Sequence, residues 1–206
     1  MFPFQLPHKI GIDFDNTLID YSNVFHYYAQ KHFHLDANTV KEKNVIRNKI
    51  RELDEGENKW QKLQALIYGP HICDAERFKG TLHFFRRCQK NKITLYIISH
   101  KTIFATKDET QTNLRHAALD WMANNNFFQY ISKQNIFFES TREAKIRRIS
   151  QLNCDVFIDD LEEIFFENDF PNNVRKLLFI PNKKKKTTMD IEAAQSWDEI
   201  SNLIFY

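Results

Sequence analysis

The segment IGIDFDNTL, residues 10–18, joins a short run of apolar residues to two aspartates, Asp13 and Asp15. Short apolar runs rich in Ile, Phe and Val are typical of strands in a sheet that is covered on both faces. An aspartate at the end of a buried strand is costly without a partner, so its presence there favours a functional role over a simple turn cap. We therefore expect a buried strand over residues 10–14 that carries both carboxylates to one edge of a sheet.

Four later segments share the short apolar pattern, and helical patterns lie between them. From residue 93 onward strands and helices alternate, which predicts a parallel α/β sheet with crossover connections. The helix expected over 141–152 begins after Ser140 or Thr141, either of which is a suitable N-cap residue. The expected strands are 93–98, 135–138, 156–158 and 176–180, and the expected helices are 112–124, 141–152, 161–168 and 197–204.

Residues 20–80 break this alternation. They contain no convincing strand, but they show helical patterns at 21–32, 38–51 and 59–68, the last two separated by a likely turn at 54–57. A helix over 81–90 then returns the chain to the sheet. We therefore expect an α/β core formed by 1–19 and 81–206 and a helical insertion over 20–80.

Polar side chains follow three of the predicted strands where each strand ends. Because ligands bind beyond the carboxyl ends of the strands in open parallel sheets, these side chains are expected to meet at one site. The candidate residues are Asp13, Asp15 and Thr17 after the first strand, Ser99, His100 and Lys101 after the strand at 93–98, and Asp159 and Asp160 after the strand at 156–158.

The order of these residues resembles the four motifs of the haloacid dehalogenase (HAD) superfamily. Residues 10–18 are similar to its first motif, hydrophobic-D-x-D-x-T-L, which is quite specific. Ser99, Lys145 and the Asp159–Asp160 pair resemble the second, third and fourth motifs, and together the four elements span 10–163. The resemblance implies a Rossmann-like parallel sheet with a small α-helical cap, the 20–80 insertion, placed after the first strand.

The same resemblance implies magnesium-dependent hydrolysis of a small phosphomonoester through an aspartyl-phosphate. Asp13 would be the nucleophile and Asp15 the general acid and base. Lys145 would stabilise the negative charge at the phosphoryl group, although Arg142, Arg147 and Arg148 compete for that role. The Mg²⁺ ion would be held by Asp13, the backbone carbonyl of Asp15 and Asp159, with Asp160 either a second ligand or the residue that orients a metal-bound water.

Four further residues are candidates for substrate binding. Ser99 would donate a hydrogen bond to a phosphoryl oxygen, and Thr17, His100 and Lys101 lie where they would contact substrate, although a loop role is equally compatible with His100 and Lys101. In the insertion, an aromatic stripe at helical spacing is more often packing than a binding surface. That stripe and its polar neighbours comprise Trp60, Gln64, Tyr68 and His71.

Three other functions are compatible with parts of this pattern. A phosphotransferase would keep Asp13 as nucleophile, and so would an enzyme that cleaves a C–Cl bond. Dehalogenation is disfavoured because Asp15 provides the acid and base that phosphate chemistry needs. A non-catalytic binding domain would keep the fold alone, and the full set of candidate catalytic residues argues against it.

Composition limits the partners and the location. The net charge of +2 is too balanced to indicate nucleic acid or membrane as a partner, so we expect a small phosphorylated metabolite, with no indication of oligomeric state. The basic run Lys183–Lys186 is interpreted as a solvated loop. The three cysteines form no C-x-x-C pair, which favours a reducing compartment. With no signal-peptide pattern at the start and no long apolar run, we expect a cytoplasmic protein.

Overall fold

The computed structural model describes residues 5–181 and 191–206, and the chain divides into two compact units. As far as they are described, Met1–Leu18, Arg77–Lys101 and Asn126–Tyr206 form the first unit, and Ile19–Glu76 and Thr102–Asn125 form the second. The second unit therefore contains nearly all of the expected insertion. It also takes in 102–125, which the sequence-based division assigns to the core.

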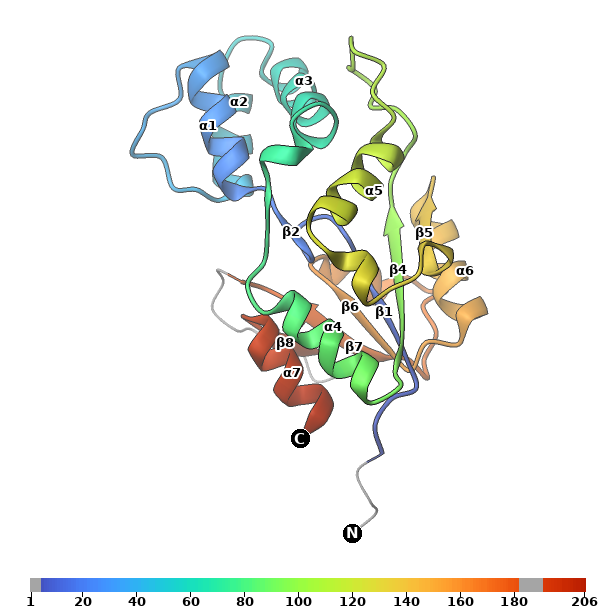
Figure 1. The fold of residues 1–206 in the computed structure, drawn as a ribbon. Helices are drawn as coiled ribbons and strands as arrows, with labels where there is room; N and C mark the ends of the chain where they lie inside the picture. Colours follow the sequence, from blue (N-terminus) through green and yellow to red (C-terminus); the bar gives the residue numbers. More distant parts are fainter. Residues whose placement is uncertain (1–4, 182–190) are drawn as a thin grey trace. The chain divides into compact units, whose positions relative to one another are not determined.

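The first unit is built on a six-stranded sheet in the order β5-β4-β1-β6-β7-β8, with every pair of neighbours parallel (Figure 1). Helices on both faces complete an α/β Rossmann-like core, which confirms the predicted fold class. The strands are β1 (Lys9–Ile12), β4 (Thr94–His100), β5 (Ile136–Glu139), β6 (Val156–Asp159), β7 (Arg175–Phe179) and β8 (Glu192–Ala194).

Each face of this sheet is covered by a different set of apolar side chains. On one face, α6 (Arg142–Leu152) and the 3-10 helix η4 (Glu162–Phe166) pack with Phe157 in a single buried cluster. On the other, α4 (Thr81–Lys90) lies beside α7 (Trp197–Phe205), with the rings of Phe84 and Trp197 5.1 Å apart (Figure 1). Burial on both faces explains why the strands have continuous apolar sequences.

Gly11 allows β1 to lie close to the side chains of the neighbouring strand. A Cβ atom at this position would come within 2.6 Å of the ring of Phe157 and 3.1 Å of Cys154 Sγ. The glycine in the first motif therefore has a packing reason. It keeps β1 in register with β6, where Ile12 pairs with Ile158.

The second unit contains the three helices expected in the insertion, together with α5 (Leu114–Asn124). The predicted Trp60 lies in its core, where its ring stacks on Phe25 at 5.1 Å, and the half-buried Tyr68 packs against the same Phe25 ring. The buried indole of Trp121 on α5 donates a hydrogen bond to the carbonyl of Ala75, 2.8 Å away, which explains why α5 groups with this unit. The other helices are α1 (Ser22–Phe33), α2 (Lys43–Arg51), α3 (Gly56–Tyr68) and the 3-10 helix η1 (Ile72–Asp74).

Several boundaries differ from the sequence-based expectation. The strand β8 was not predicted, nor was the short pair of β2 (Ile19–Asp20) and β3 (Glu76–Arg77), because two or three residues are too few to show a periodic pattern. The expected helix over 161–168 is a short 3-10 helix. The predicted turn at 54–57 ends earlier, since Glu55 has a left-handed backbone (φ 48°) and α3 begins at Gly56.

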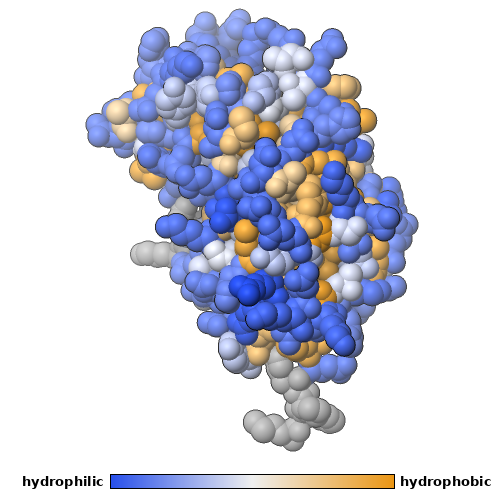
Figure 2. Space-filling view, viewed as in Figure 1, coloured by the Kyte–Doolittle hydropathy of each residue, from blue (hydrophilic) through white to orange (hydrophobic). Residues whose placement is uncertain are grey.

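The surface features that bear on partners are unremarkable. Figure 2 shows hydrophilic residues over much of the visible face, with hydrophobic residues between them. Across residues 5–181 and 191–206, no helix combines the length and apolar character that crossing a membrane requires. Cys73, Cys88 and Cys154 are all free thiols. The basic run Lys183–Lys186 lies outside the described residues.

Candidate active site

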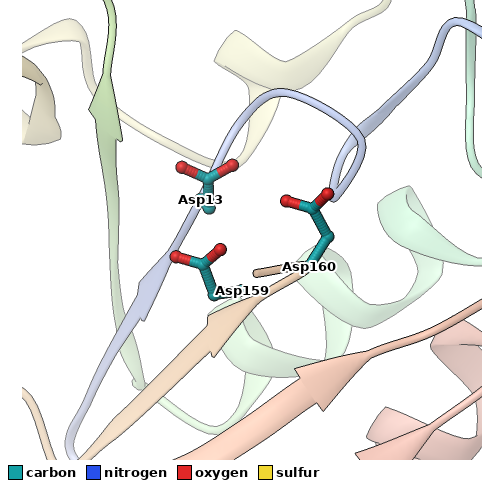
Figure 3. A group of neighbouring side chains, drawn as sticks. All are labelled: Asp13, Asp159 and Asp160. Atoms are coloured by element: carbon teal, nitrogen blue, oxygen red, sulfur yellow. The ribbon is translucent and has the colours of Figure 1, made fainter. Parts of the chain in front are cut away.

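The acidic residues predicted from three segments meet at the carboxyl end of the sheet. Asp13 directly follows β1, Asp159 ends β6 and Asp160 follows it, and Figure 3 shows the three carboxylates turned toward one another. The backbone N–H of Asp13 donates to the carbonyl of Ile158 at 2.9 Å, which extends the β1–β6 ladder into the site. The strand order reverses at β1, because β4 and β5 lie on one side of it and β6, β7 and β8 lie on the other. Open α/β sheets bind ligands at the carboxyl ends of the strands at such a switch point.

Lys145 joins two of these carboxylates. Its ammonium donates hydrogen bonds of 2.6 Å to Asp13 Oδ1 and of 2.6 Å to Asp159 Oδ2. The lysine lies in the first turn of α6, whose N-cap residue Thr141 accepts from the backbone N–H of Ala144 at 3.1 Å, as the sequence predicts. Lys145 is 2% exposed and Asp159 is fully buried, so one ammonium partly offsets the charge of two carboxylates away from water.

Ser99 lies on the other side of Asp13. Its hydroxyl, 1% exposed on β4, donates to Asp13 Oδ1 at 2.9 Å. Both contacts with Asp13 thus engage one oxygen, and among the described residues Oδ2 has no hydrogen-bond partner. The serine and the lysine hold the carboxylate in one orientation while its second oxygen remains available.

Burial and neighbouring charges shift the pKa values of Asp159 and Lys145. Desolvation raises the pKa of Asp159; the Lys145 ammonium opposes this effect, and the Asp13 carboxylate adds to it. For Lys145, burial disfavours the charged form, but the two carboxylates outweigh it and raise the pKa of the ammonium. Lys145 is therefore charged at neutral pH.

Asp15 and Lys101 form a second ion pair in the same unit. The Lys101 ammonium donates to Asp15 Oδ2 at 2.7 Å and to Oδ1 at 3.1 Å. The sequence places Lys101 among candidate substrate contacts, but it does not indicate this pairing, because the two residues are 86 positions apart. Side chains alternate along β4 and into the residue after it, so Ser99 and Lys101, two positions apart, point to one side, and this spacing is visible in the sequence.

Thr17 and His100 complete the predicted set. Thr17 is fully buried, and its hydroxyl has no hydrogen-bond partner within the described part of the chain. The exposed His100 has Nε2 3.2 Å from the carbonyl oxygen of Ser140. Asp13, Ser99, Lys145, Asp159 and Asp160 are thus brought together, whereas His100 is directed to a neighbouring loop.

The three carboxylates are spaced for a shared cation. One oxygen from each of Asp13, Asp159 and Asp160 lies within 4.8 Å of the others. In an octahedral Mg²⁺ shell with ligands at about 2.1 Å, opposite oxygens are about 4.2 Å apart, so a small adjustment or one intervening water satisfies this geometry. The charges agree as well: with Asp15, four carboxylates face two ammonium groups, and the excess of two negative charges suits a divalent ion.

Comparison with known proteins places the fold. Neither a scan against protein-family models nor a search of curated proteins gave a match. Among solved structures, the chain is similar to a HAD family hydrolase from Deinococcus radiodurans with bound phosphate and sodium, at 10% identity and a TM-score of 0.59, covering 96% of this chain and 97% of that chain.

Two other solved structures cover 98% of this chain. Protein Tyrosine Kinase A (PtkA) from Mycobacterium tuberculosis has 14% identity and a TM-score of 0.63, with 98% of this chain and 100% of that chain covered. The putative HAD-hydrolase YfnB from Bacillus subtilis, bound to magnesium, has 11% identity and a TM-score of 0.52, with the same coverage of 98% and 100%. At these identities the likeness concerns the fold. Since it extends over nearly the whole length of each protein, we conclude that this chain is a HAD-fold protein.

Proposed function

We propose that this chain is a magnesium-dependent phosphohydrolase that acts on a small phosphorylated metabolite through an aspartyl-phosphate on Asp13. The observation that carries the proposal is the surroundings of Asp13. Its carboxylate is held through one oxygen by Lys145 and Ser99, and it lies beside Asp159 and Asp160 at the ligand-binding edge of the sheet. The phosphate in the Deinococcus structure and the magnesium in YfnB agree with this assignment.

In the first half of the proposed reaction, Asp13 Oδ2 attacks phosphorus. A bond forms between this oxygen and phosphorus, and the bond from phosphorus to the leaving-group oxygen breaks. Asp15 donates a proton to that oxygen as it departs, because an alkoxide is a poor leaving group. Lys145 lies 2.6 Å from the other oxygen of Asp13 and stabilises the negative charge that gathers as the carboxylate approaches the phosphoryl group.

In the second half, Asp15 accepts a proton from water, whose oxygen attacks the phosphorus of the aspartyl-phosphate. The bond between Asp13 and phosphorus breaks, and inorganic phosphate leaves. Asp13, Asp159 and Asp160 would hold the Mg²⁺ ion, with the backbone carbonyl of Asp15 as a further oxygen ligand. When bound, the ion supplies positive charge that neutralises the phosphoryl oxygens.

The remaining predicted residues have supporting roles in this proposal. Ser99 and Thr17 are assigned to the surroundings of the phosphate, and the helical segment 20–80 is assigned to a cap that excludes water and selects the leaving group. The three free cysteines support a reducing, cytoplasmic location. The balanced charge supports a small metabolite, rather than nucleic acid or a membrane, as the partner.

Hydrolysis of p-nitrophenyl phosphate tests the proposal directly. We expect turnover by the wild-type protein with MgCl₂, little with EDTA, and at least a 10³-fold loss in Asp13→Asn, which keeps the shape but removes the nucleophile. Arg175→Met is a matched control, because it removes an ion pair with Glu192 at the opposite end of the sheet. Equal turnover by Asp13→Asn and the wild type would refute the assigned nucleophile.

A phosphotransferase is the alternative that the fold similarity to PtkA brings forward. It would form the same aspartyl-phosphate and pass the phosphoryl group to an acceptor other than water. Measuring released inorganic phosphate together with consumed substrate separates the two reactions. Equal amounts favour hydrolysis, and a shortfall of phosphate that depends on an added alcohol or protein acceptor favours transfer.

A further inference from the structure

Lys101 is a buried cation that has no part in the two steps of the proposed reaction. Only 4% of the residue is exposed, and its ammonium donates to both oxygens of Asp15, at 2.7 and 3.1 Å. Its backbone N–H donates to the carbonyl of Glu139 at 2.8 Å, one residue beyond β4. The backbone of Lys101 is therefore fixed to the sheet at one end of the side chain, and the ammonium is fixed to Asp15 at the other.

The two donors, Ser99 and Lys101, have the same two-residue spacing as the two aspartates of the first motif. Asp13 and Asp15 are two residues apart after β1, and Ser99 and Lys101 are two residues apart at the end of the adjacent parallel strand β4. Side chains two positions apart in an extended chain point to the same side. As a result, Ser99 on β4 donates to Asp13, while Lys101, one residue beyond β4, donates to Asp15.

Burial gives Lys101 a physical reason to pair with Asp15. An ammonium withdrawn from water needs a nearby anion, and Asp15 supplies it. The Lys101 ammonium also lies 5.5 Å from the centre of the Phe14 ring, a further favourable contact for a buried cation. The ammonium engages both oxygens of Asp15, which is the contact that a residue holding this carboxylate in one orientation would make.

We propose that Lys101 is a positioning residue that holds the carboxylate of Asp15 in place to transfer a proton to and from the reacting oxygen. The inference rests on the proposed function, in which Asp15 is the acid and base. It gives Lys101 a role different from the substrate contact that the sequence suggests.

The basicity of the leaving group separates the two roles. A p-nitrophenolate leaves without a proton, whereas a phenolate that lacks the nitro group benefits from a proton donor. Loss of a positioning residue for Asp15 therefore lowers kcat/KM for phenyl phosphate more than kcat/KM for p-nitrophenyl phosphate. This ratio covers the steps through departure of the leaving group and leaves out hydrolysis of the aspartyl-phosphate, which is the same for both esters. Loss of a phosphate ligand reduces both equally, because the phosphoryl group is the same in each.

The experiment compares kcat and KM of the wild type, Lys101→Met and Asp15→Asn on both esters with MgCl₂. We expect Lys101→Met to lower kcat/KM for phenyl phosphate by about 10- to 100-fold and kcat/KM for p-nitrophenyl phosphate by less than about threefold. Asp15→Asn should show the same selectivity, and Lys101→Arg should restore part of the loss. Equal losses on both esters, or no loss on either, would overturn the inference.

Two further variants keep the test decisive. Lys101→Met/Asp15→Asn removes both charges of the ion pair, so neither charge is left without its partner and the variant is expected to fold. Its activity should match that of Asp15→Asn alone. A larger loss in the double variant would show that Lys101 acts independently of Asp15. Arg175→Met is again the control outside the site.

Binding of inorganic phosphate, measured by calorimetry with MgCl₂, gives a readout without turnover. Lys101→Met should bind phosphate within about twofold of the wild type, whereas a phosphate ligand would lose about tenfold or more. Failure of the proposed function appears differently, as absent turnover in the wild type or unchanged turnover in Asp13→Asn. Weakened phosphate binding by Lys101→Met would refute the positioning role alone.

Discussion

Replacing Lys145 by methionine preserves most of the side-chain length but removes the ammonium 2.6 Å from Asp13 and 2.6 Å from Asp159. Both carboxylates are almost completely buried, with exposed fractions of 5% for Asp13 and 0% for Asp159. The substitution therefore leaves two desolvated anions next to each other without their shared cation.

Breaking a buried ion pair by removing one partner costs about 3–5 kcal/mol, which corresponds to a decrease in Tm of about 6–20 °C for a chain of this size. The loss should depend on pH. Without Lys145, the pKa of Asp159 rises further above that of the unfolded chain, so the native state binds the proton more tightly. Stability of the variant therefore falls as pH rises above the unfolded value of about 4, and the deficit should be larger at pH 8 than at pH 5.

Urea unfolding in EDTA, followed by circular dichroism at pH 5 and pH 8, measures this effect. Lys176→Met is a matched control, because the Lys176 ammonium donates at 2.9 Å to a neutral carbonyl, that of Phe165. Its loss should cost only about 1 kcal/mol, with little change between the two pH values. If Lys145→Met were destabilised no more than this control, or equally at both pH values, the assignment of Lys145 as the cation shared by two buried carboxylates would be wrong.

Three further predictions concern the site and its support. Mg²⁺ binds the ionised carboxylate, and burial raises the pKa of Asp159 to about 6. Magnesium affinity measured by calorimetry should therefore fall as pH decreases below 6, by roughly tenfold at pH 5. A pH-independent affinity would contradict this. Alanine at both Asp159 and Asp160 should raise the magnesium concentration needed for half-maximal turnover at least tenfold, and an unchanged requirement would remove the pair from the metal site. Gly11→Ala should lower the free energy of unfolding by about 1–3 kcal/mol, because its Cβ would lie 2.6 Å from the Phe157 ring. Magnesium affinity should stay the same. A neutral effect on stability would show that β1 has room to shift.

The sequence predicts the core well because its strands are short, apolar and buried on both faces. The segment expected over 156–158 is β6 (Val156–Asp159), and the helix expected over 81–90 has the same bounds as α4 (Thr81–Lys90). The convergence of Asp13 with Asp159 and Asp160 also follows from the sequence, since parallel strands bring their carboxyl ends to one edge.

What the sequence does not predict depends on contacts between distant residues. Helix α5 has the periodicity of a core helix, but the hydrogen bond from Trp121 to Ala75 associates it with the second unit. The pairing of Lys101 with Asp15 depends on the register between β1 and β4. The sequence alone does not show which strands pair or in which register. Both contacts arise from tertiary packing that local patterns do not encode.

The account depends most on Asp13 being a nucleophile beside a shared divalent cation, and a crystal structure with Mg²⁺ and beryllium fluoride tests both parts at once. We predict a beryllofluoride group bonded to a carboxylate oxygen of Asp13, with a Mg²⁺ ion contacted by Asp13 and by at least one of Asp159 and Asp160. A beryllofluoride group on another residue, or a metal ion bound away from these three carboxylates, would contradict the proposed mechanism.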